Sequence, residues 1–164
     1  GVVAPGMIVN VKQSVVTAAY STTVGAVYAN IGNLAVSITP KSASNKILVM
    51  IDAKISHTPD STVVRGRLIR ETGGVTTAPY VGDAASNRPR SSTAQYKLSS
   101  GRAGTHDQGA AEPTFLDSPN TTSEITYKLY FRGSSGSYTY YINRRSSDDL
   151  FRGSTSLTLM EISG

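Results

Sequence analysis

The sequence predicts an all-β protein, an antiparallel β-sandwich for which we expect a jelly-roll topology. Many short segments alternate apolar and polar residues at period two, the pattern of strands that turn one face to a core. Segments rich in Gly, Ser, Asn and Pro separate them, and no window is dominated by the helix formers Ala, Leu, Glu and Lys. Strands at this spacing, without helical segments between them, are typical of a sandwich.

A strand, loop and strand over residues 34–55 form the expected centre of the fold. Apolar residues alternate with Ala, Ser and Thr over residues 34–39. Pro40 ends this strand because proline has no N–H for a sheet. After a polar loop, residues 47–51 are apolar at every position, so we expect a central strand that is covered on both faces.

Further strands are expected before this centre. The first covers residues 7–15, and residues 22–28 form a strand with a bulge at Gly25. Residues 30–33 are expected to be a turn.

After the centre, His57 lies in a predicted turn, and a strand follows over residues 63–70. Thr72-Gly-Gly74 predicts a hairpin to a return strand at residues 75–81, because glycine supplies the positive φ of such turns. Alternation divides the residues of the first of these strands between two faces, with Val64, Gly66 and Leu68 opposite Arg65, Arg67 and Ile69.

The pattern is weaker over residues 82–113, where long polar connections flank a short strand expected at residues 93–98. Long loops in a compact domain are usually functional or become ordered on a partner. Beyond them, residues 125–131 and 138–143 are expected to pair as the clearest hairpin of the chain. The last strand, residues 154–162, turns alternate residues to opposite faces, Leu157 and Leu159 against Met160 and Ile162.

Length and composition exclude several classes of protein. With 164 residues we expect an extended N-terminal segment, residues 1–6, and one β-sandwich domain, residues 7–164. The absence of cysteine excludes disulfides, thiolate metal sites and cysteine nucleophiles. A net charge of +5 would permit nucleic-acid binding, but the charges are scattered, so we expect solvated arginines and no nucleic-acid partner. No apolar run reaches the roughly 20 residues of a membrane span.

Catalytic chemistry finds little support. His57 near Asp60 lacks the turn that presents a nucleophilic serine, and His106 beside Asp107 lacks further metal ligands at a supporting spacing. We therefore expect no enzyme, no cofactor and no catalytic residue. A calcium site built from loop carboxylates is a minor alternative that stays open, with Asp83, Asp107 and Asp117 as its ligands.

Nine tyrosines are the more suggestive feature. Several fall in the predicted hairpin, where exposed rings would suit a protein interface or sugar stacking, and paired rings would only stabilise the hairpin. The residues we expect at an interface or a glycan contact are Tyr130, Tyr138, Tyr140, Tyr141, Arg88, Arg90 and His106.

Segments spread over most of the chain resemble a β-sandwich module of structural proteins in tailed bacteriophages. The similarity is carried by Met7-Ile-Val-Asn-Val-Lys-Gln13, Leu34-Ala-Val-Ser-Ile-Thr-Pro40, Ser44-Asn-Lys-Ile-Leu-Val-Met50, Leu116-Asp-Ser-Pro119, Thr126-Tyr-Lys128, Tyr141-Ile-Asn-Arg144 and Ser156-Leu-Thr-Leu-Met-Glu-Ile162.

The resemblance implies a non-enzymatic virion protein without a cofactor, either a capsid decoration (cement) protein or the end of a tail fibre. Many such modules are trimers, so it implies a homotrimer on the virion surface. Decoration is the first hypothesis, with the major capsid protein as partner, because no collagen-like or heptad shaft precedes the domain. The alternative is a receptor-binding tip among the tail components that holds host polysaccharide.

Overall fold

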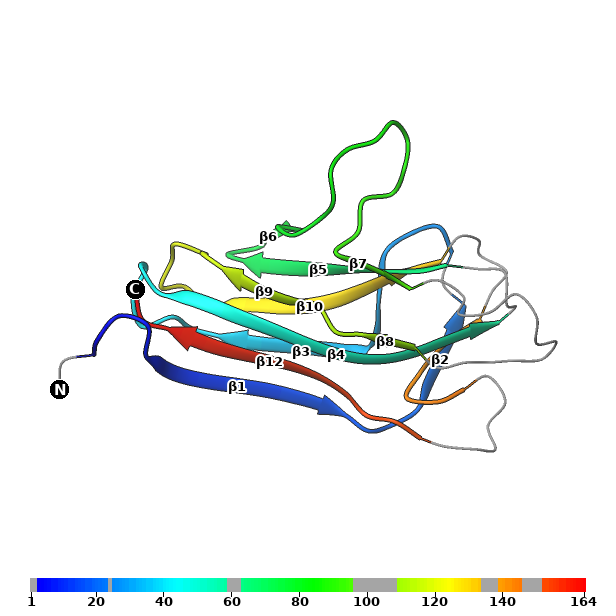
Figure 1. Ribbon diagram of the computed structural model, residues 1–164, viewed down its shortest axis with the longest axis horizontal. Helices are drawn as coiled ribbons and strands as arrows, with labels where there is room; N and C mark the ends of the chain where they lie inside the picture. Colours follow the sequence, from blue (N-terminus) through cyan, green and yellow to red (C-terminus); the bar gives the residue numbers. More distant parts are fainter. Residues whose placement is uncertain (1–2, 24, 59–62, 96–108, 134–138, 146–151) are drawn as a thin grey trace.

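The computed structural model describes residues 3–23, 25–58, 63–95, 109–133, 139–145 and 152–164, and these form twelve strands in two packed sheets (Figure 1). All pairings between the strands are antiparallel. The prediction of an all-β antiparallel sandwich is therefore confirmed.

The larger sheet has seven strands and is centred on one long strand. Its order is β1 (Ile8–Val16), β12 (Thr155–Ile162), β4 (Lys46–Thr58), β11 (Thr139–Ile142) and β2 (Tyr20–Thr23). Two short strands, β9 (Thr114–Asp117) and β8 (Gly109–Ala111), also pair with β4.

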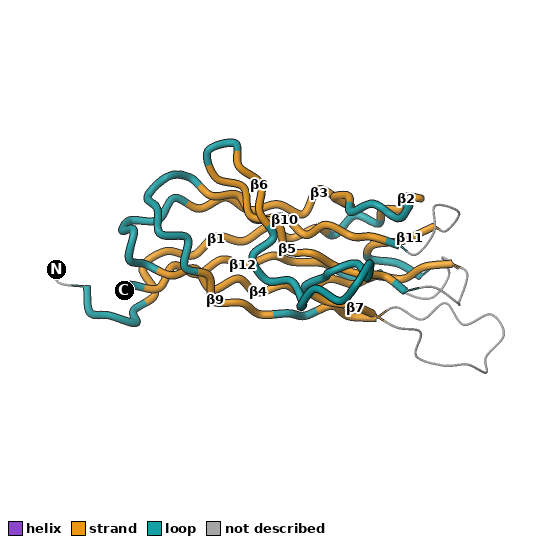
Figure 2. Tube along the Cα trace, turned by 90° about the horizontal axis from the view of Figure 1, so that it is seen from above, coloured by secondary structure: helices purple, strands orange, loops and turns teal. Residues whose placement is uncertain are grey.

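The smaller sheet has five strands. Its order is β3 (Ala29–Ile38), β10 (Ile125–Arg132), β5 (Val64–Thr72) and β6 (Val75–Thr77), and β7 (Thr93–Gln95) also pairs with β5. The consecutive strands β2 to β5 alternate between the two sheets. Figure 2 shows an elongated sandwich with both ends of the chain at one end of it.

The core lies between the sheets and is filled by alternate residues of their long strands. Strands β10 and β12 bury every second side chain without interruption. Glu161 belongs to this inward set in β12, where its carboxylate accepts hydrogen bonds from Lys41 N and Asn45 Nδ2, each at 2.6 Å. The buried apolar side chains include Leu34, Val36, Ile38, Ile47, Val49, Ile51, Leu68, Ile125, Leu129, Phe131, Leu157 and Leu159.

Strand β4 is central, as predicted, but the expectation that both of its faces are covered is wrong. Ile47, Val49 and Ile51 are buried, whereas Met50 between them is 40% exposed. The apolar run therefore belongs to a strand that turns one of its two apolar faces outward.

Local expectations have mixed outcomes. Gly73 and Gly74 have φ of 56° and 80°, so the hairpin between β5 and β6 is confirmed. The turn expected at residues 30–33 is wrong, because these residues lie in β3, and β2 ends before the bulge expected at Gly25. His57 lies inside β4 and not in a turn.

The hairpin predicted for residues 125–131 and 138–143 is also wrong. Strand β10 pairs with β3 and β5 in the smaller sheet, while β11 pairs with β2 and β4 in the larger sheet. Both strands alternate buried and partly exposed residues, so each can serve in either sheet. Alternation alone could not distinguish a hairpin from a connection that crosses the sandwich.

Candidate interaction surfaces

The residues predicted for an interface or glycan contact do not form one site. Tyr140 is 1% exposed in the core, so its prediction as a surface contact is wrong. Tyr141 is partly exposed on β11, where the Arg144 guanidinium lies 4.7 Å from its ring centroid. Arg88 is exposed in the connection between β6 and β7. The predictions for Tyr138 and His106 lie outside the described residues.

Two of the predicted residues do lie near each other, on the outer face of the smaller sheet. Tyr130 of β10 is directly opposite Arg67 of β5. Arg67 donates a hydrogen bond to the carbonyl oxygen of Arg90, and its guanidinium lies 3.8 Å from the ring centroid of Tyr28. The Tyr28 hydroxyl donates to the same carbonyl at 2.7 Å, so the exposed connection that carries Arg90 is attached to this face.

The outer face of the larger sheet is different in character, because a row of large apolar side chains crosses it. Val11 on β1 pairs with Met160 on β12, Met160 pairs with Leu48 on β4, and Leu48 pairs with Leu116 on β9. Strands β12 and β9 flank β4 on its two edges at Leu48, so these four residues lie side by side. Val11 and Leu116 are 52% and 48% exposed. We call Val11, Met160, Leu48 and Leu116 the apolar row.

The neighbouring rows place the apolar row at one end of this face. The next row along the strands contains Gln13, Thr158 and Met50. The side chains of Gln13 and Thr158 are joined by a hydrogen bond of 2.8 Å. Further along β4, Lys54 forms ion pairs with Asp52 and Glu112. On the other side of the apolar row, exposed Lys46 pairs with Ile162. The apolar row therefore lies between Lys46, near the chain termini, and the charged residues at the far end of the face.

A buried ionic cluster joins the two sheets. The Asp117 side chain on β9 is 4% exposed, and Arg70 Nη1 on β5 lies 2.8 Å from both of its oxygens. The Tyr127 and Tyr80 hydroxyls donate to the same carboxylate at 2.6 and 3.1 Å. Burial raises the pKa of Tyr80 to about 12 and also raises the pKa of Tyr127.

These contacts make the Asp117 cluster structural. Its carboxylate already accepts three donor groups, so the alternative of a calcium site that includes Asp117 is not supported by its surroundings. In the part of the chain that the structure describes, no group of three or more His, Asp or Glu could hold a metal ion. Nor do the described residues include a helix that could cross a membrane.

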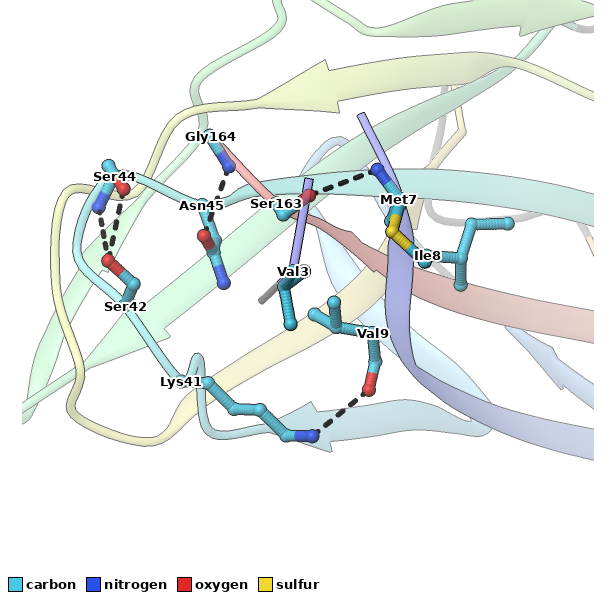
Figure 3. Close-up of a pocket in the computed structure, with 10 residues that line it drawn as sticks. All are labelled: Val3, Met7, Ile8, Val9, Lys41, Ser42, Ser44, Asn45, Ser163 and Gly164. Atoms are coloured by element: carbon cyan, nitrogen blue, oxygen red, sulfur yellow. Dashed lines mark hydrogen bonds between the residues drawn. The ribbon is translucent and has the colours of Figure 1, made fainter. Parts of the chain in front are cut away.

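A hollow of about 500 Å³ lies where the two ends of the chain meet (Figure 3). Many of its polar groups bond each other, as Met7 N does with Ser163 Oγ, Gly164 N with Asn45, and Lys41 Nζ with the Val9 carbonyl. These bonds attach β1 and the loop after β3 to the C-terminus. The hydrogen bonds around the hollow therefore close this end of the sandwich.

Comparison with known proteins bears on the fold. No protein-family model matches the chain, and no curated protein matches its sequence. Among solved structures, the chain is similar to part of a chain in the structure of infectious bursal disease virus, Gt strain. The TM-score is 0.50 at 12% identity, over 96% of this chain and 39% of that chain. A chain in the structure of the Gx strain gives a TM-score of 0.39 at 10% identity, over 95% of this chain and 43% of that chain.

The first similarity shows a β-fold shared with a chain from a virus structure, and this chain spans about two fifths of that chain's length. The resemblance to a tailed-bacteriophage module stays a prediction. Sequence reasoning missed the apolar row as a unit, because the row exists only through the pairing of four strands. It also gave no sign that the Tyr28 ring lies beside Arg67 and Arg132, which are far from it in the sequence.

Proposed function

We propose that this chain is a non-enzymatic structural protein of a virus particle that assembles as a homotrimer through the outer face of its larger sheet. The observation that carries the proposal is the apolar row across β1, β12, β4 and β9. Contiguous exposed apolar surface on a soluble protein usually marks an interaction site. The fold shared with a chain from a virus structure supports the viral context.

The width of this face suits three copies around an axis. Neighbouring strands are about 4.8 Å apart, so four strands make a face about 19 Å wide. Three such faces arranged as a triangular prism leave about 5.5 Å between each sheet and the axis, close to half of the roughly 10 Å that separates packed sheets. Side chains of the apolar row would fill that space.

The polar groups of the same face are compatible with burial. Gln13 and Thr158, in the row next to the apolar one, hydrogen bond to each other. The charged residues Asp52, Lys54 and Glu112 lie at the far end, where a trimer would leave them at its margin. Apolar side chains bordered by polar and charged residues are a common composition of protein interfaces.

On the particle, we propose a position on the surface of the capsid as a decoration protein. Residues 1–6 and the part of the chain from residue 82 to residue 113 would contact the major capsid protein, while the outer faces of the larger sheets meet inside the trimer. Cryo-electron microscopy of the virus with an antibody fragment against this chain tests the position. Label over the capsid supports decoration. Label at a tail tip would replace it with the receptor-binding role.

The interface is tested by light scattering after size-exclusion chromatography. We expect the wild type at about 52 kDa, three times its 17.3 kDa mass. Val11→Asp and Leu116→Asp should yield folded monomers, because each places a charge in the apolar row. Val75→Asp is the matched control, since Val75 is 63% exposed on β6 of the other sheet. A wild-type monomer at 100 μM, or equal dissociation by all three variants, would contradict the proposal.

A further inference from the structure

The outer face of the smaller sheet concentrates positive charge at one end. Arg132 on β10 is directly opposite Arg65 on β5, and Arg67 lies two residues further along β5. The guanidinium carbons of Arg67 and Arg132 lie 3.8 and 5.9 Å from the ring centroid of Tyr28. Arg67 and Tyr28 also donate hydrogen bonds to the backbone carbonyl of Arg90, whereas the Arg90 side chain donates to the Gly82 carbonyl at 2.6 Å. We call Arg65, Arg67 and Arg132 the arginine cluster.

No carboxylate neutralises this cluster among the residues that the structure describes. The ion pairs found there involve Lys54, Arg70 and Lys128, and none involves a member of the cluster. Like charges directly opposite each other on paired strands are destabilising. The pairing of Arg65 with Arg132 therefore lowers stability in the free protein, and a bound anion would offset that loss.

Unsatisfied polar atoms gather in the same region. The Nε atoms of Arg67 and Arg132 are buried without a hydrogen-bond partner in the described part of the chain. The same holds for Oδ1 of Asn30, which is opposite Tyr130 on β3. Buried polar atoms are nearly always bonded in native proteins, so this group of exceptions marks a region where protein groups do not satisfy the guanidinium donors.

The composition of the site favours a short acidic saccharide. Guanidinium groups bind carboxylate and sulfate through paired hydrogen bonds, and the flat face of a tyrosine ring suits the apolar face of a sugar. The positive charge does not continue along the sheet, because Lys128 is paired with Glu71 at 2.6 Å. Double-stranded DNA usually needs a longer stripe, with about 6–10 phosphate contacts.

We propose that the arginine cluster, together with Tyr130, binds an acidic glycan. The carboxylate or sulfate groups lie against Arg65 and Arg132, and a sugar ring lies on Tyr130. This site is on the sheet opposite the apolar row, so it goes beyond self-association and does not depend on it.

Isothermal titration calorimetry of the full chain tests the site. The probes are a heparin-derived hexasaccharide, hexagalacturonate and neutral maltohexaose, all at 0.15 M salt. We expect at least one acidic probe to bind and maltohexaose not to bind. Arg65→Ala and Arg132→Ala should each weaken that binding at least tenfold, and Arg65→Lys should weaken it less. Lys12→Ala, an exposed lysine on β1 of the other sheet, removes the same charge and should change binding less than twofold.

Thermal unfolding monitored by circular dichroism shows whether each variant is folded. Because Arg65→Ala removes a like-charge contact, its melting temperature should equal or exceed that of the wild type. The proposal is overturned if neither acidic probe binds, or if Lys12→Ala weakens binding as much as Arg65→Ala does. It is also overturned if a DNA oligonucleotide of equal charge binds more tightly than both saccharides. Light scattering on the same samples reports self-association separately.

Discussion

Asp117→Asn should destabilise the sandwich strongly, because Asp117 joins the two sheets through a buried charge. Arg70 Nη1 lies 2.8 Å from both carboxylate oxygens, and the Asp117 side chain is 4% exposed. Removing one partner of a buried ion pair typically costs about 3–5 kcal/mol. Asn keeps one acceptor, so we expect a loss of about 3 kcal/mol. At about 2–4 °C per kcal/mol for a domain of this size, the melting temperature should fall by about 6–12 °C.

Urea unfolding followed by far-ultraviolet circular dichroism measures this loss, with Asp52→Asn as the matched control. Asp52 forms an ion pair with Lys54 on the sheet surface, where its side chain is 48% exposed. Exposed pairs contribute about 1 kcal/mol or less, so the control should change stability little. Equal losses in both variants would refute the reasoning that burial of Asp117 makes its ion pair important.

Three further predictions concern single positions. Gly133→Ala would place a Cβ 1.8 Å from the hydroxyl oxygen of buried Tyr140, so we expect a loss of about 3 kcal/mol in urea unfolding. Gly82→Ala, whose nearest atom is 3.9 Å away, should change stability by less than about 0.5 kcal/mol, and a similar loss at both positions would contradict the geometry. Asn143→Ala should lower the free energy of unfolding by about 2–3 kcal/mol, because Asn143 is fully buried and its amide donates to two backbone carbonyls. An unchanged free energy of unfolding would show that these hydrogen bonds do not stabilise the fold. The pKa of Tyr80 rises from 10.0 to about 12 on folding, so its contribution to stability is complete below pH 10 and is lost between pH 10 and 12. Tyr80→Phe should make that fall in stability with pH less steep, and an unchanged slope would argue against the shift.

Period-two alternation predicted the all-β class and most long strands, because a strand with one buried face leaves that pattern directly in the sequence. The final strand is an example, since Leu157 and Leu159 are buried as predicted while Met160 on the opposite face is partly exposed. Alternation does not state which strands pair. Tyr140 was therefore expected at the surface of a hairpin, although β11 belongs to the other sheet and buries it.

The candidate surfaces depend on register, which a single sequence does not contain. Arg65, Arg67 and Arg70 lie close together in the sequence, but alternation turns Arg70 inward to Asp117 and the other two outward. Asp117, which pairs with Arg70, and Arg132, which lies opposite Arg65, are both far from these arginines in the sequence. The apolar row has the same origin, because its four members come from four strands.

The most direct test of the central claim is the distance between equivalent residues of different copies. The chain has no cysteine, so Leu48→Cys and Val75→Cys each provide a single labelling site. If the larger sheet faces a threefold axis, spin labels at position 48 should show intersubunit distances below about 20 Å, since packed sheets lie about 10 Å apart. Labels at position 75 should be farther apart. An absence of coupling at position 48, or a shorter distance at position 75, would contradict assembly through the apolar row.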